Sequence, residues 1–145
     1  FGELRTDRAV LVDSGSLIRS VVTSLTNKSR LGVIQPLAGQ IPKTRAATRD
    51  KWGELDVVVT SASTYGAPEA RARDWECAAK ELRDKDVDLV LLNCMGMDET
   101  MRQAVHRVVQ KPVMLASAVV ARMVDELLTG GEVEAEVTSD PPDES

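Results

Sequence analysis

The sequence predicts an α/β fold, a three-layer sandwich in which helices cover both faces of a parallel sheet of four to five strands. Short apolar runs rich in Val, Ile and Leu recur along the chain, and continuous runs are typical of strands buried on both faces of a parallel sheet. Segments with helical spacing separate these runs. Strand–helix alternation predicts parallel strands with short connections, and 145 residues are within the size of one domain.

Four apolar runs predict strands, and a weaker run before them predicts a fifth. The four are Leu31–Ile34, Leu55–Thr60, Val87–Leu92 and Pro112–Leu115, and the weaker one is Ala9–Val12.

The first predicted helix follows the weaker strand. Ser14 and Ser16 are candidates to cap it, and its apolar side holds Leu17, Ile18, Val21, Val22 and Leu25. A shorter helix is predicted from Pro42 to Trp52.

Three further helices complete the alternation. Pro68 suits the first turn of a helix to Asp84, with an apolar stripe of Ala70, Trp75, Ala78, Ala79 and Leu82. Asp98 is a candidate cap for the next helix, which carries Met101, Val105, Val108 and Val109. Ser117 is expected to open the last helix as its cap, and Gly130 and Gly131 are expected to end it.

The acidic residues are unevenly distributed. The net charge is −5, yet six of the 23 acidic residues follow Gly131, in a stretch without Lys or Arg. We expect residues 1–130 to form the folded lobe and residues 131–145 to form a mobile acidic tail.

Composition excludes several classes of function. Aromatic residues make up 3% of the chain, which argues against stacking on single-stranded nucleic acid, and the near-neutral body argues against a binder of phosphate backbones. No apolar run is long enough for a membrane helix, and no signal peptide is recognisable. Two cysteines do not make a secreted disulfide framework, so we expect a cytoplasmic protein.

The loops after the predicted strands are the candidate ligand site, because ligands of open parallel sheets bind beyond the carboxyl ends of the strands. The loop from Asn93 to Met97 places Cys94 just before the helix that Asp98 caps. Backbone N–H groups at a helix N-terminus can stabilise a thiolate or hold a carboxylate, and Gly96 would allow close approach of a ligand. A small buried hydrophobe is the equally open alternative for Cys94.

Polar groups in the other strand-end loops are further candidates. The candidate substrate-binding residues are Gln40, Ser61, Ser63, Thr64, Tyr65, Asn93, Met95, Gly96 and Ser117; the hydroxyl groups are suited to a carboxylate or amide, although turn and cap roles explain them too. Cys77 is expected to pack inside a helix, and His106 to lie on a helix surface, away from the strand ends.

Several familiar sites are absent from the sequence. It has no paired His or Cys-x-x-Cys pattern for a metal, and neither glycine-rich nucleotide motif. A single mid-helix His argues against a Ser-His-Asp triad.

Four stretches resemble the AroM family, with matching order and spacing from about Ala9 to Leu128. They are LGVIQPLAGQ at residues 31–40, Lys51-Trp52, DLVLLNCMGM at residues 88–97 and KPVMLASAVVAR at residues 111–122. The family is similar to the aspartate/glutamate/hydantoin racemase superfamily. The resemblance therefore implies that this chain is a racemase-like lobe of a two-lobed protein with a ligand cleft between the lobes.

The same resemblance implies a chemistry. In the superfamily each lobe supplies one cysteine; one thiolate removes a proton from the carbon next to a carboxylate, and the other thiol returns a proton to the opposite face. No pyridoxal cofactor or metal is required. Cys94 falls at the second of these cysteines, while Asn93 departs from an Asp and Met97 from an aromatic residue. Phe1–Leu4 looks like the continuation of a Cys-Thr-Gly-x-Phe segment, so the first lobe is expected upstream.

Three functions follow as alternatives. The first is a cofactor-independent racemase or isomerase-like enzyme that acts on a small carboxylate or amide through Cys94. The second is a small-acid binding protein on the same scaffold, which the absence of a second catalytic thiol favours. The third, a flavodoxin-like or receiver-type domain, lacks acidic residues at its strand ends. A lobe without its partner is expected to form a homo-oligomer or to associate with the missing lobe.

Overall fold

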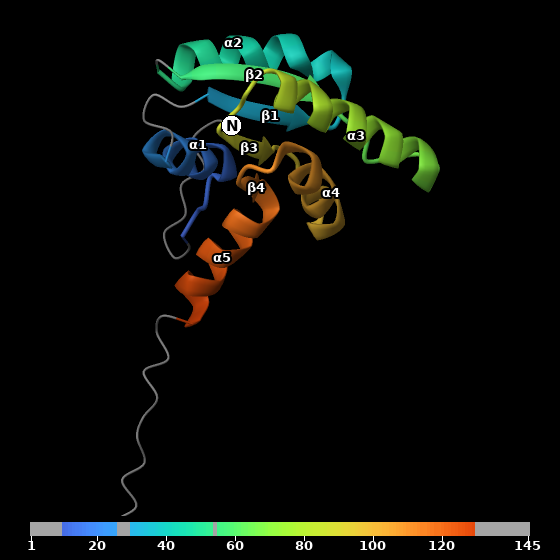
Figure 1. The fold of residues 1–145 in the computed structure, drawn as a ribbon. Helices are drawn as coiled ribbons and strands as arrows, with labels where there is room; N and C mark the ends of the chain where they lie inside the picture. Colours follow the sequence, from blue (N-terminus) through green and yellow to red (C-terminus); the bar gives the residue numbers. More distant parts are fainter. Residues whose placement is uncertain (1–9, 26–29, 54, 130–145) are drawn as a thin grey trace, which may run out of the picture.

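The computed structural model describes residues 10–25, 30–53 and 55–129, and in them five helices and four strands alternate (Figure 1). A 3₁₀ turn at Ala38–Gln40 precedes the second helix. The elements are α1 (Ser14–Leu25), β1 (Arg30–Gln35), α2 (Ile41–Lys51), β2 (Asp56–Ser61), α3 (Pro68–Asp84), β3 (Leu89–Leu92), α4 (Glu99–Val109), β4 (Val113–Leu115) and α5 (Ala116–Thr129). The predicted α/β class is confirmed.

The four strands form one parallel sheet in the order β2-β1-β3-β4 (Figure 1). Each of the four stronger apolar runs became a strand, with bounds shifted by a residue or two. Leu31 of the central strand β1 lies opposite Val57 of β2 and Leu89 of β3. Because both neighbours are hydrogen-bonded to it, β1 has no free edge, and its residues from Leu31 to Gln35 are all buried.

The core has two layers, one on each face of the sheet. Successive side chains of a strand point to opposite faces, so Leu31 and Val33 pack with helices α1, α2 and α5, while Ile34 packs with α3 and α4. The helices thus cover both faces, in the three-layer arrangement that continuous apolar strands require.

Two local expectations about burial and strands are wrong. Val10–Val12 of the weaker predicted strand form no strand, and Ala9 lies outside the described residues. Val10 is 78% exposed and Leu11 is 62% exposed, so this segment buries little of the apolar surface that would hold it against the sheet. In addition, Ala70 is exposed, although the predicted stripe residues Trp75, Ala78, Ala79 and Leu82 are buried.

The caps of two helices also differ from expectation. Asp13, rather than Ser14 or Ser16, caps α1, because its carboxylate accepts from the backbone N–H groups of Gly15 and Ser16. Ser117 lies inside α5, which begins directly after β4, and its hydroxyl donates to the Met97 carbonyl at 3.3 Å. Asp98 caps α4 as predicted, accepting from the Met101 N–H at 2.9 Å.

The connections make a crevice at the carboxyl ends of β1 and β3. The chain leaves β1 through α2 on one face, reaches β2, and returns through α3 on the other face to β3, on the far side of β1. The loops after β1 and β3 therefore diverge, and this is where ligands bind in open parallel sheets.

None of the helices in the described residues is long and apolar enough to cross a bilayer. The described residues also contain no group of three or more His, Cys, Asp or Glu side chains that could hold a metal ion. The predicted tail, residues 131–145, lies outside the described residues.

Candidate functional site

Cys94 lies in the turn between β3 and α4, at the carboxyl end of the sheet. The Asn93 N–H donates to the Ile34 carbonyl at 3.0 Å, which continues the pairing of β3 with β1 up to the turn. The backbone N–H of Gly96 donates to Cys94 Sγ at 3.4 Å, and the Met97 N–H closes the turn on the Cys94 carbonyl. The thiol is thus held by the backbone, half-buried, at the start of α4.

A cavity of about 480 Å³ opens on the α1 side of Cys94. Its lining residues are Asp13, Ser14, Gly15, Ser16, Ile18, Arg19, Trp52, Asn93, Cys94, Met95 and Ala116. The hydrogen bond from the Ser16 hydroxyl, at 2.7 Å, and that from the Ser16 N–H hold the pKa of the Asp13 carboxyl below its usual range. Asp13 is therefore ionised at neutral pH. Its carboxylate lies at the N-terminus of α1, where it accepts from the Gly15 and Ser16 N–H groups.

A second cavity, of about 410 Å³, opens on the α2 side of the same thiol. Its lining residues are Gln35, Pro36, Gln40, Lys43, Thr44, Ala47, Thr48, Trp52, Asn93 and Cys94. Trp52, Asn93 and Cys94 line both cavities. Cys94 therefore lies where the two cavities adjoin, beside the crevice that the topology makes.

The structure brings some of the predicted site residues to this junction. Gln40 lines the α2-side cavity, Met95 lines the α1-side cavity, and Asn93 lines both. Gly96 takes part through its backbone N–H. Ser117 is directed at the Met97 carbonyl, in the same turn.

The hydroxyl-rich loop after β2 lies elsewhere. Ser61 and Ser63 line a different cavity, of about 340 Å³, together with Cys77 and Asp74 of α3. The Ser63 hydroxyl donates to the Tyr65 carbonyl and accepts from the Tyr65 N–H, as in a turn. Tyr65 is 76% exposed, and the Thr64 carbonyl accepts from Arg71.

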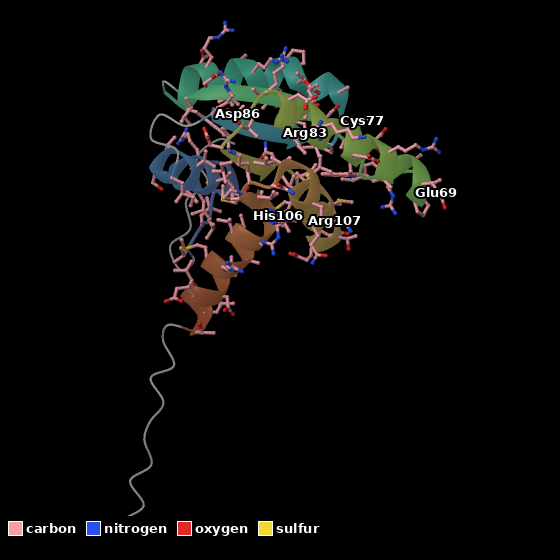
Figure 2. The ribbon with its side chains drawn as sticks, viewed as in Figure 1. Glu69, Cys77, Arg83, Asp86, His106 and Arg107 are labelled. Atoms are coloured by element: carbon pink, nitrogen blue, oxygen red, sulfur yellow. The ribbon has the colours of Figure 1, made fainter. Side chains whose placement is uncertain are left out.

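The second cysteine and the histidine are both exposed (Figure 2). Cys77 was expected to pack inside its helix, and this is wrong, because it lies on the open side of α3 next to the buried Ala78. His106 lies on the surface of α4, as expected, with its Nδ1 2.9 Å from the Lys111 carbonyl oxygen.

The predicted site did not include the residues that α1, α2 and their ends contribute to the two cavities. Asp13, Arg19, Lys43 and Trp52 all line the cavities at Cys94, but each lies on or beside a helix rather than in a strand-end loop. The signal that could have indicated Lys43 is its position in the first turn of a helix, where a positive charge is unfavourable.

The comparison with protein families identifies one match. The AroM protein family model matches residues 1–128, and it includes every strand and both cavities described above. No curated protein matches the chain. The chain belongs to the AroM family.

Proposed function

We propose that this AroM family protein is a cofactor-independent racemase or isomerase-like enzyme that acts on a small carboxylate or amide through Cys94. The observation that supports the proposal best is the position of the thiol at the junction of two cavities, at the topological switch point of a parallel sheet. Cys94 also packs against the core cluster that includes residues of α3 and α4, so its position combines packing with contact to both cavities.

The proposed step is a proton transfer to sulfur. The Cys94 thiolate takes a proton from the carbon next to the ligand's carboxylate, so that a C–H bond breaks and an S–H bond forms. The electron pair remains on the ligand, delocalised into the carboxylate. The Gly96 N–H donates to Sγ and holds the sulfur in the turn before α4. Return of a proton to either face completes exchange or inversion.

Exchange of the ligand's α-hydrogen with solvent tests this step without requiring inversion. In D₂O, candidate small amino acids and hydroxy acids should acquire deuterium at the α-carbon in the presence of the protein, measured by ¹H NMR. Cys94→Ala should slow the exchange at least about a hundredfold, the usual contribution of a general acid–base group. Cys77→Ser is the matched control, because it removes an exposed thiol from a different cavity, and it should leave the rate unchanged. Equal rates for Cys94→Ala and the parent protein would refute the assignment.

A second function, binding of a small acid without turnover, is supported by one observation. Among the described residues that line the two cavities, Cys94 is the single thiol, so a two-thiol inversion has no partner among them. Thermal stabilisation by a small acid, with no deuterium at its α-carbon, would favour this alternative. Detected exchange that depends on Cys94 would eliminate it.

The compartment is part of the proposal. Cys77 and Cys94 are both free thiols, which suits a reducing compartment such as the cytoplasm. We further propose that the protein associates with itself or with a second lobe, because α5 exposes large apolar side chains to solvent.

A further inference from the structure

The α2-side cavity contains a buried polar side chain with unused hydrogen-bonding capacity. Gln35, the last residue of β1, is 4% exposed and lines this cavity. Its backbone carbonyl accepts from the Ala62 N–H, but its side-chain amide makes no hydrogen bond with any residue that the structure describes. The amide atoms of Gln35 are not among the fully buried side-chain atoms that lack a partner. The amide therefore keeps access to the open space of the cavity, where it can bind a molecule.

The first turn of α2 lines the same cavity and carries no anion of its own, although the Ile41 N–H already donates to the Ala38 carbonyl and Pro42 has no N–H. The N-cap of α2, Gln40, makes no side-chain cap hydrogen bond, and the first turn has no acidic residue. Lys43 lies in that turn and lines the cavity, and it forms no ion pair with a described residue. Lys43 is exposed to solvent, and its positive charge near the positive end of a helix dipole favours an anion bound beside it.

The α1-side cavity shows the contrast. There the carboxylate of Asp13 already accepts hydrogen bonds from N–H groups in the first turn of α1. The negative charge of Asp13 therefore already occupies the N-terminus of α1. The α2-side cavity combines the ammonium group of Lys43 with the amides of Gln35 and Asn93, and it has no carboxylate among its described lining residues. Its fixed charge therefore favours an anion.

We propose, on the basis of the function proposed above, that the α2-side cavity is the carboxylate subsite, in which the ammonium of Lys43 and the amide of Gln35 bind the ligand's carboxylate next to Cys94. The ligand class is then a small carboxylate, and a neutral amide of the same shape is discriminated against. Binding energy comes from charge as well as from hydrogen bonds, so it weakens with salt.

Propionate and propionamide are suitable probes, because they share a shape and differ in charge. The chain has two tryptophans, and each gives one indole N–H signal in a ¹⁵N–¹H spectrum. Trp52 lines the cavity, whereas the Trp75 indole N–H donates to the Ser63 carbonyl and serves as an internal reference. At neutral pH and low salt, propionate should shift the Trp52 signal at a concentration at which propionamide does not.

Lys43→Met should weaken the propionate response about fivefold, as expected for one exposed charge pair, and should leave any propionamide response unchanged. Lys85→Met is the matched control: Lys85 lies at the other end of the sheet, at the C-cap of α3, and its loss should change nothing. Gln35→Glu, which places a negative charge in the cavity, should abolish the propionate response.

The possible failures separate the two proposals. If propionamide shifts the Trp52 signal as strongly as propionate does, or if Lys43→Met responds like the parent protein, the carboxylate subsite is overturned while Cys94-dependent exchange is untouched. If neither probe shifts the Trp52 signal, the subsite is overturned as well. The proposed function fails only if α-hydrogen exchange does not depend on Cys94.

Discussion

The surroundings of Gly32, which has no side chain, show how tightly α3 packs against β1. Gly32 lies in β1, and a Cβ built on it would come within 2.9 Å of Leu82 Cδ1 and 3.0 Å of Leu82 Cδ2. Leu82 is itself fully buried in α3, so it has little room to move. The glycine therefore allows α3 to pack directly on the strand whose end carries Gln35.

Gly32→Ala should destabilise the protein by about 1–3 kcal/mol, because it overpacks the core against Leu82. Urea unfolding followed by circular dichroism measures this change. Gly39→Ala is the matched control, because nothing lies within 4 Å of a Cβ at that position. A stability of Gly32→Ala equal to that of the control would show that α3 does not pack against β1 as described.

At the scale of elements, the strands could be predicted from the sequence because their burial on both faces forces unbroken apolar runs, as at Leu31–Ile34 and Val87–Leu92. The segment Ala9–Val12 has the same local pattern, but the pattern does not reveal that Val10 and Leu11 remain exposed rather than pack against the sheet. The face that Cys77 takes on α3 was likewise decided by packing, since one helical step separates it from the buried Ala78.

The candidate site was only partly predictable for the same physical reason. Cys94, Asn93 and Met95 follow a strand, so the rule for parallel sheets located them. Which other loops face Cys94 depends on the strand order β2-β1-β3-β4, which is a tertiary property. That order places α1 and α2, rather than the hydroxyl-rich loop after β2, around the thiol.

At the scale of the whole molecule, the layer formed by α1 and α5 leaves apolar surface uncovered. Val119 and Val120 of α5 pack against the core, but Met123, Val124, Leu127 and Leu128 further along the helix are exposed, where α5 extends beyond the sheet (Figure 1). Leu25 at the end of α1 is exposed as well. A continuous apolar helix face in contact with water favours association.

The chain is therefore expected to self-associate when it is produced alone. Light scattering coupled to size-exclusion chromatography should give a mass above that of one 15.7 kDa chain. Replacing Val124 and Leu127 together by Glu should shift the mass towards the monomer, whereas Thr129→Glu, which adds a charge at a polar position of the same helix, should not. A monomeric parent protein at high concentration would contradict this expectation.

The accessibility of Cys94 to a small acid is the claim on which the rest depends, and residue-resolved alkylation of the folded protein tests it most directly. Iodoacetate and iodoacetamide form the same S–C bond with loss of iodide, but the first carries a carboxylate and the second an amide. Mass spectrometry should find Cys94 modified by both, with a ratio of iodoacetate to iodoacetamide rates higher than at the exposed Cys77. If the folded protein reacts at Cys77 while Cys94 is modified by neither reagent, the thiol is closed to ligands and the account is wrong.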